Sequence, residues 1–209
     1  QASAEAWHAP RPIEGRTETI TAVIPCNRGV PLGLKALKEQ DVDVDVLILS
    51  NGDGPLAADG ARVVQVPWEG HGRTRARAIQ HIESEYVFFT VDDAIPMGQG
   101  CLGTLVDALK NGGWDAVVAR QVPWPDADAV TASRIRRWMP PGQKVTSFSQ
   151  TDHVGTLMRT DTLRSFPIPS VPIAEDAWWS LKRRVGYVPM APLLHSHVRE
   201  PGALFDSLL

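Results

Sequence analysis

The distribution of hydrophobic residues along the chain predicts strands that alternate with helices. Short apolar runs rich in β-branched and aromatic residues are typical of strands buried in a sheet, whereas helical spacing of apolar residues predicts helices. Strands are expected at residues 19–25, 42–50, 61–67, 86–91, 116–120, 155–159, 187–189 and 193–198. Helices are expected at residues 31–38, 72–83, 102–110, 132–137, 160–165 and 173–184, the last ended by Gly186. The alternation predicts an α/β fold with a doubly wound, mostly parallel central sheet flanked by helices.

The length and the local amino-acid composition of the chain predict one domain preceded by an N-terminal arm. Residues 1–18 mix alanine, proline and charge without periodicity, and residues 19–209 are expected to form a single domain with one core. The composition changes after residue 120, and tryptophan and proline are frequent from there to residue 150. That stretch is either the wall of a binding site, a mobile lid or a structural insertion.

Charge, cysteine content and hydropathy restrict the class of protein. The net charge of -3 gives no basic footprint, so nucleic acid is not expected as a partner. Cys26 and Cys101 are far apart in sequence, which favours a reducing compartment without a disulfide framework. No apolar run is long enough to span a bilayer and no signal-peptide core opens the chain, so a soluble, cytoplasmic protein is expected.

The predicted strand that starts at Tyr86 ends in two adjacent carboxylates, Asp92 and Asp93, before Pro96. Ligands bind at the carboxyl ends of strands in open α/β sheets, and paired acids there suit a hard divalent cation with phosphate as a co-ligand. The alternative is that the two aspartates only start a turn or cap a helix.

A second polar turn follows the strand at 42–50, and a basic helix follows the strand at 61–67. Residues 51–57 match a loose dinucleotide fingerprint, but Pro55 does not open a long helix, so only contacts of Asn51 and Asp53 with a base or ribose are expected. Arg73 and Arg77 lie four residues apart on one helix face. They could converge with the acidic pair on a diphosphate, or form a solvated basic surface.

Two motifs in the C-terminal part of the sequence contain residues that could act in catalysis or in metal binding. Glu175 and Asp176 open a predicted helix, where they either cap it or act in a sugar-sized pocket beside Trp178 and Trp179, one of them as general base. The two tryptophans point in different directions on a helix, so at least one is expected in the core. The sequence His195-Ser196-His197 sets two imidazoles close together, either as ligands for Mn or as ordinary histidines.

The order of these motifs resembles that of the inverting family-2 glycosyltransferases with the GT-A fold. The resemblance runs from about Ile20 to His197, and is best at residues 85–96, which are similar to the family's GEYVLFLDDDxxP stretch. It also covers residues 155–159 followed by Ala174-Glu175-Asp176. The resemblance implies a nucleotide-sugar-binding half at 19–120 and an acceptor-binding half at 121–209.

The resemblance also implies roles for individual residues. Asp93 would bind Mn2+ or Mg2+ that holds the donor diphosphate, with Asp92 near the ribose or the metal. Asp176 would be the base that deprotonates the acceptor hydroxyl. The remaining implied contacts are Pro25 and Asn27 with the nucleoside, Asn51 with the base, Arg77 with the diphosphate, and His195 or His197 with the metal.

Three departures from the family pattern bear on the donor. Val91 stands where many members have a first aspartate, Asn51 stands where an acid usually contacts uracil, and Pro25-Cys26-Asn27 is one residue shorter than the usual PTYN. These departures leave a non-uridine donor open.

The implied activity is metal-dependent, inverting transfer of a sugar from a nucleoside-diphosphate donor to a carbohydrate, lipid-linked or small-molecule acceptor. A sugar nucleotidyltransferase and a non-catalytic nucleotide- or carbohydrate-binding module are the alternatives. Many relatives act on lipid-linked acceptors, which would involve peripheral membrane contact, but the apolar tail at 203–209 is too short to establish it.

Overall fold

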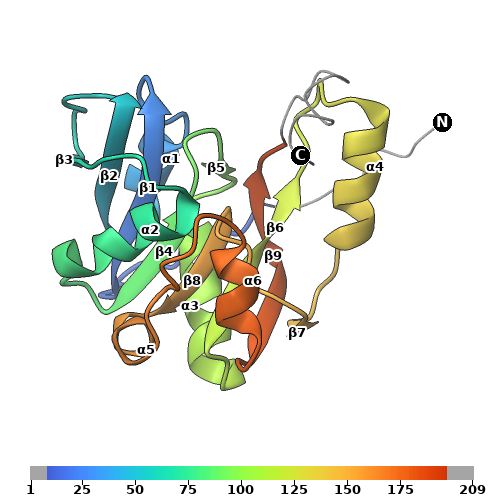
Figure 1. The fold of residues 1–209 in the computed structure, drawn as a ribbon. Helices are drawn as coiled ribbons and strands as arrows, with labels where there is room; N and C mark the ends of the chain where they lie inside the picture. Colours follow the sequence, from blue (N-terminus) through green and yellow to red (C-terminus); the bar gives the residue numbers. More distant parts are fainter. Residues whose placement is uncertain (1–8, 197–209) are drawn as a thin grey trace.

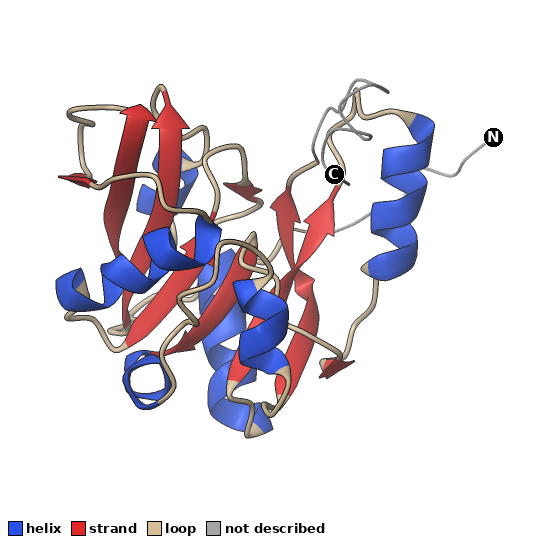
Figure 2. Cartoon of the chain, viewed as in Figure 1, coloured by secondary structure: helices blue, strands red, loops and turns tan. Residues whose placement is uncertain are grey.

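The computed structural model describes residues 9–196, and these residues form a mixed α/β fold around one nine-stranded sheet (Figures 1 and 2). The order along the sheet is β3-β2-β1-β4-β8-β6-β9-β5, and β7 also pairs with β9. The strands are β1 (Thr19–Arg28), β2 (Asp43–Asp53), β3 (Arg62–Gln65), β4 (Tyr86–Thr90), β5 (Ile95–Pro96), β6 (Ala116–Val122), β7 (Thr146–Phe148), β8 (Gly155–Arg159) and β9 (Val185–Leu194). The helices are α1 (Leu34–Lys38), α2 (His71–Ala76), the 3-10 helix η1 (Arg77–His81), α3 (Cys101–Gly112), α4 (Ala129–Trp138), α5 (Thr160–Ser165) and α6 (Glu175–Ser180).

The central strands are buried on both faces, which explains their continuous apolar runs. Along β4, Tyr86 and Phe88 pack with α1 and α3, whereas Val87 and Phe89 pack with η1, α5 and α6 on the other face. Figure 1 shows η1, α5 and α6 on the near side of the sheet. The predicted doubly wound α/β architecture is therefore confirmed.

Strand directions set the positions of the polar strand ends. The pairs β1–β2, β1–β4, β2–β3 and β6–β9 are parallel, and β8 runs antiparallel between β4 and β6. The carboxyl ends of β1, β2 and β4 therefore meet at one edge of the sheet. The last strand, β9, reaches the same edge beside β6.

The C-terminal part corrects two predictions. The helix expected at 173–184 is only α6, and Gly186, expected to end it, lies inside β9. A Cβ at Gly186 would meet the Trp114 ring at 2.9 Å, so the glycine is needed where the indole covers the strand. The strands expected at 187–189 and 193–198 both begin within one strand, β9, which ends at Leu194 and whose register against β6 shifts between Ala119 and Arg120. Residues 197 and 198 lie outside the described residues.

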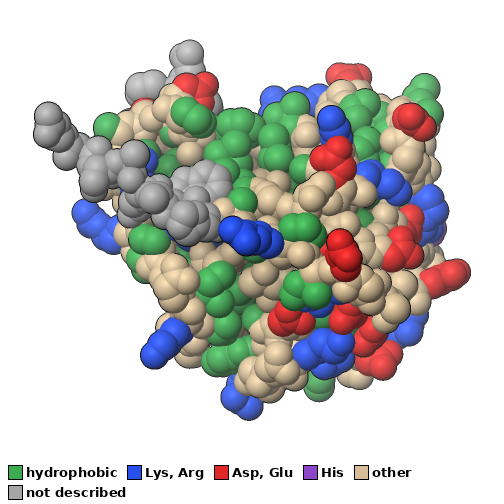
Figure 3. All heavy atoms as spheres, turned by 180° about the vertical axis from the view of Figure 1, so that it is seen from behind, with side chains coloured by type: hydrophobic (Ala, Val, Ile, Leu, Met, Phe, Trp, Pro, Cys, Tyr) green, Lys and Arg blue, Asp and Glu red, His purple; other side chains and the backbone are tan. Residues whose placement is uncertain are grey.

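The surface of the described residues is mixed in charge, and their helices are short. On the face opposite to that of Figure 1, acidic and basic side chains are interspersed among hydrophobic ones (Figure 3). None of the helices within residues 9–196 has the length and apolarity that crossing a bilayer requires. The tail at 203–209 lies outside the described residues.

Candidate active site

A cavity of about 440 Å³ lies at the carboxyl ends of β1, β2 and β4. Its walls come from these strand ends, from the loop after β3 and from α2. The lining residues are Pro25, Cys26, Asn27, Arg28, Asn51, Trp68, His71, Arg75, Val91, Asp92 and Asp93. Five predicted site residues, Pro25, Asn27, Asn51, Asp92 and Asp93, are thus brought together, as their strand-end positions led us to expect.

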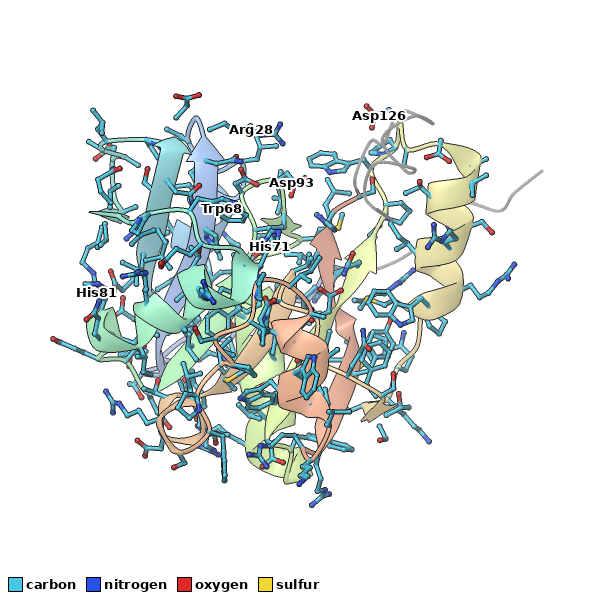
Figure 4. All side chains as sticks on the ribbon, viewed as in Figure 1. Arg28, Trp68, His71, His81, Asp93 and Asp126 are labelled. Atoms are coloured by element: carbon cyan, nitrogen blue, oxygen red, sulfur yellow. The ribbon has the colours of Figure 1, made fainter. Side chains whose placement is uncertain are left out.

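The two aspartates of the acidic pair have different partners. Burial and the adjacent charge of Asp93 raise the pKa of Asp92, while Arg28, whose Nε lies 3.9 Å from Asp92 Oδ2, opposes that rise. Asp93 Oδ1 lies 3.5 Å from His195 Nε2. Figure 4 shows Arg28 and Asp93 near the upper end of β1, with Trp68 and His71 just below.

His195 reaches Asp93 because of two strand pairings that the sequence pattern did not reveal. The short strand β5 pairs antiparallel with β9, with Ile95 opposite Leu194, so the residues flanking this pair become neighbours. The backbone N–H of His195 donates to Val122 O (2.9 Å), which continues the β6–β9 ladder. His195 is 3% exposed, and its Nδ1 lies 2.9 Å from Gln121 Oε1. His197 lies outside the described residues.

Asn51 ends the buried part of β2, and its side chain belongs to the cavity wall. The residue is 3% exposed, and its Nδ2 has no hydrogen-bond partner within the described chain. A buried amide donor is stable only when an acceptor reaches it, and a carbonyl of a bound base would do so. Asp53, expected to share this role, is exposed and is not among the lining residues.

Arg75, rather than Arg73 or Arg77, faces the cavity. Arg73 and Arg77 border a separate hollow of about 490 Å³ with Glu69, to which Arg77 donates from Nε at 3.1 Å. The two arginines share a face, as predicted, but they do not converge on the acidic pair. The buried face of α2 carries Gly72, Thr74 and Arg75 instead.

A buried ion pair holds Arg75. Its Nη1 lies 2.5 Å from Glu175 Oε1, and His153 Nδ1 lies 3.3 Å from the same oxygen. Burial alone would raise the pKa of Glu175, but the hydrogen bond from His153 and the charge of Arg75 outweigh it and lower the pKa to about 2. Burial lowers the pKa of His153, and its hydrogen bond with Glu175 opposes that shift. The expected substrate contact of Glu175 is therefore corrected to a structural ion pair.

Asp176 follows Glu175 on α6 and is half-buried. Its backbone carbonyl accepts a hydrogen bond from Thr151 Oγ1 (2.8 Å), which ties the helix to the segment before β8, and a second one from Ser180 Oγ (2.6 Å) within the same helix. Its negative charge contributes to the raised pKa of the buried Asp152, for which burial is the largest cause. Asp176 thus lies near the β8 end of the sheet, outside the lining of the cavity described above.

The two tryptophans of α6 separate as the helical geometry predicts. Trp179 is 5% exposed, packs in the core and donates from Nε1 to Phe166 O at 2.7 Å. Trp178 is 63% exposed. Only Trp178 can offer a ring face to a ligand, so the expected substrate contact of Trp179 is wrong.

The loop between β3 and α2 supplies cavity residues that the sequence pattern did not single out. Trp68 and His71 both line the cavity, and their rings meet edge to face with centroids 5.1 Å apart. The available signal was position, because this loop also follows the carboxyl end of a parallel strand.

Comparison with known proteins gives a shared fold. No family model and no curated protein matches the sequence. Among solved structures, S. aureus TarS 1-349 in complex with UDP-GlcNAc matches 87% of this chain at 13% identity with a TM-score of 0.65. A mannosyltransferase from Pyrobaculum calidifontis, PcManGT, in complex with GDP-Man and Mn2+, matches 95% of this chain at 16% identity with a TM-score of 0.64. GalNAc-T7 with UDP, GalNAc and Mn2+ matches 90% of this chain at 9% identity with a TM-score of 0.65.

The chain spans 59%, 62% and 45% of these three structures, respectively. The resemblance at identities this low concerns the fold. The chain therefore has the GT-A type of α/β fold found in these glycosyltransferases.

Proposed function

We propose that this chain is a metal-dependent inverting glycosyltransferase that moves a sugar from a nucleoside-diphosphate donor to an acceptor hydroxyl. The observation that carries the proposal is the pairing of Asp93 with His195, 3.5 Å apart, beside a cavity at the ends of parallel strands. The fold shared with TarS and PcManGT, which are described with UDP-GlcNAc and GDP-Man, supports it.

The donor set of Asp93 and His195 suits Mn2+ or Mg2+. A carboxylate oxygen and an imidazole nitrogen are ligands that Mn2+ accepts, and Mg2+ is commonly held by one or two carboxylates together with substrate phosphates. Within residues 9–196, no group of three or more His, Cys, Asp or Glu side chains is placed to hold a metal ion by itself. The proposal assigns the remaining ligands to the donor diphosphate. When bound, the cation supplies positive charge that balances the leaving group.

The strand ends and Trp68 are assigned to the nucleoside. Asn51 offers its buried Nδ2 to the base, Pro25 and Asn27 flank it, and the half-exposed Trp68 ring provides a face for stacking. Asp92, with its raised pKa, is assigned to the ribose or the metal. The donor is therefore expected to be selected at Asn51 through the acceptors of its base.

Arg75 is assigned to the diphosphate. Arg75 lines the same cavity as Asp93, and its Nε has no partner among the residues that the structure describes. Glu175 holds the other side of the group at Nη1. A guanidinium fixed in this way keeps donors available for phosphate oxygens.

Asp176 is assigned as the general base. Its carboxylate takes the proton of the acceptor hydroxyl as that oxygen attacks the anomeric carbon, and the bond to the diphosphate breaks on the opposite face. A single displacement inverts the configuration. The exposed Trp178 on the same helix gives an acceptor sugar an aromatic face.

Two alternative functions predict results that differ from those of the proposed glycosyltransferase. A sugar nucleotidyltransferase needs a glycine-rich basic loop after its first strand, whereas residues 25–29, at the end of β1, supply only Arg28 and Gly29. A non-catalytic binding module would keep the cavity and need no base at Asp176. Both alternatives predict that no sugar is transferred or released from a nucleoside-diphosphate sugar.

The test is sugar transfer and donor hydrolysis with UDP-GlcNAc and GDP-Man in Mn2+, measured for the parent chain and for Asp176→Asn. The expected loss is about 10²–10⁴-fold in rate, with nucleotide binding retained. Asp161→Asn is the matched control, because the Asp161 side chain is 94% exposed. Unchanged transfer in Asp176→Asn would refute its role, and nucleotide binding without any turnover by the parent would favour the binding module.

A further inference from the structure

A chain of buried polar side chains runs from Asp93 into the interior. His195 Nε2 lies 3.5 Å from Asp93 Oδ1, and His195 Nδ1 lies 2.9 Å from Gln121 Oε1. Gln121 Nε2 in turn donates to Asp152 Oδ2. Gln121 and Asp152 are 6% and 9% exposed, so water does not compete strongly for these contacts. Neither residue is part of the site proposed above.

The chemistry of these groups fixes the direction of the hydrogen bonds. The backbone N–H of Val154 donates to Asp152 Oδ1 at 3.1 Å, and an ionised carboxylate only accepts. The amide nitrogen of Gln121 must therefore face Asp152, which leaves the amide oxygen facing His195. Since that oxygen also only accepts, the proton of the imidazole must be on Nδ1.

This arrangement has a consequence at the other ring nitrogen. With the proton on Nδ1, the lone pair of Nε2 points toward the Asp93 carboxylate. Two electron-rich groups at that distance attract a cation between them. The opposite tautomer would direct an N–H at Asp93 and form a hydrogen bond that competes with a metal ion.

We propose that Gln121 and Asp152 are positioning residues that hold His195 as the Nδ1–H tautomer, with Nε2 preset as a metal ligand beside Asp93. The inference rests on the proposed metal-dependent function. Partners behind metal-binding histidines generally fix the tautomer and ring orientation, and their loss typically weakens metal binding about 10- to 100-fold.

The donor–acceptor direction of the hydrogen bonds from Asp152 through Gln121 to His195 can be reversed by one substitution and restored by a second. In Asp152→Asn, the new amide can donate to Gln121, whose own amide then turns its NH2 toward His195 and favours the Nε2–H tautomer. Adding Gln121→Glu gives a carboxylate that accepts both from Asn at 152 and from Nδ1–H of His195. The double variant keeps the net charge of the parent and nearly the same shapes.

The experiment has two readouts. Nitrogen-15 NMR of the histidine rings in metal-free protein at pH 8.5, above the ordinary titration of histidine, reports whether Nδ1 of His195 is protonated. Binding of Mn2+ alone, measured by electron paramagnetic resonance, reports the metal affinity. Thermal unfolding verifies that each variant is folded, and Asp161→Asn serves as the exposed control.

We expect Nδ1 to be protonated in the parent, to lose its proton in Asp152→Asn with at least about 10-fold weaker Mn2+ binding, and to regain both properties in the double variant. An unchanged tautomer in folded Asp152→Asn would overturn the inference. If the tautomer switches as predicted but the parent binds no Mn2+, either alone or with a nucleoside diphosphate, the positioning role stands and the metal-dependent function fails.

Discussion

At the scale of single residues, the contrast between Asp93 and Glu175 shows how burial separates chemically similar groups. Glu175 is 2% exposed, and its carboxylate is shared by Arg75 and His153. Asp93 borders the cavity and is more accessible, with a side chain that is 24% exposed. The first carboxylate therefore stabilises the fold and orients an arginine, whereas the second lies at the wall of the cavity.

The Glu175 ion pair predicts a pH-dependent contribution to stability. The folded pKa of about 2 lies below the ordinary value of 4.5, so the contribution is complete above about pH 4.5 and is lost as the pH falls toward 2. The shift corresponds to roughly 3 kcal/mol. Glu175→Gln should unfold more easily than the parent by about that amount at pH 7, because it leaves Arg75 buried without its partner.

Urea unfolding of both proteins from pH 7 to 2 tests this linkage. The difference in unfolding free energy between parent and Glu175→Gln should shrink below pH 4.5, as protonation removes the same charge from the parent. Glu83→Gln, at an exposed position, should show no such difference. If the difference in unfolding free energy between the two proteins stays constant with pH, Glu175 does not titrate as the ion pair requires.

At the scale of elements, the close approach of α2 to the connector before α6 positions Arg75. A Cβ at Gly72 would lie 2.4 Å from Val171 O and 2.8 Å from Glu175 Cβ. The backbone of α2 therefore comes close only because residue 72 has no side chain. The ion pair between Arg75 and Glu175 depends on this approach.

Gly72→Ala should accordingly separate α2 from α6. We expect a loss of about 1–3 kcal/mol in unfolding free energy, in spite of the better helix propensity of alanine. Nucleotide affinity should also fall, since Arg75 moves with the helix. Arg73→Ala, an exposed change on the same helix, should leave unfolding stability nearly unchanged. Thermal unfolding and nucleotide titration of the two variants measure both effects, and a Gly72→Ala protein as stable as the parent would contradict the account.

The elements that the sequence predicted are those whose stability is local or whose burial is complete. The strands β1, β2, β4 and β8 were recognisable because apolar runs mark strands covered on both faces. The strands β5 and β7 were not expected, since two or three residues carry no periodicity and depend on pairing with β9. Gly186 was misjudged because its neighbour, Trp114, is distant in sequence.

In the candidate site, too, the residues that could be predicted are those whose position depends on strand order and not on distant contacts. Residues at strand ends, such as Asn51 and Asp93, could be predicted from topology alone. Arg75 could not be distinguished from Arg73 and Arg77, because its partner Glu175 lies 100 residues away. The role of Gln121 depends on contacts with Asp152 and His195 that only the folded sheet creates.

At the scale of the whole molecule, the sheet collects groups from both halves of the chain around one edge. The first half provides Asn51, Arg75 and Asp93, and the second provides His195 and the helix with Asp176. We therefore predict that nucleotide and metal bind together, each strengthening the other, because the donor diphosphate would bridge Arg75 and the cation.

The most direct test is thermal unfolding with uridine, guanosine, thymidine, adenosine and cytidine diphosphates, each with and without Mn2+. A nucleotide at about a hundred times its dissociation constant adds roughly 2.7 kcal/mol, which for a domain of this size raises the midpoint by about 5–10 °C. We predict such a shift for one nucleotide, only with Mn2+, retained in Asp161→Ala and abolished in Asp93→Ala. No shift with any nucleotide, or an equal shift without Mn2+ and in Asp93→Ala, would contradict the metal-dependent glycosyltransferase proposal.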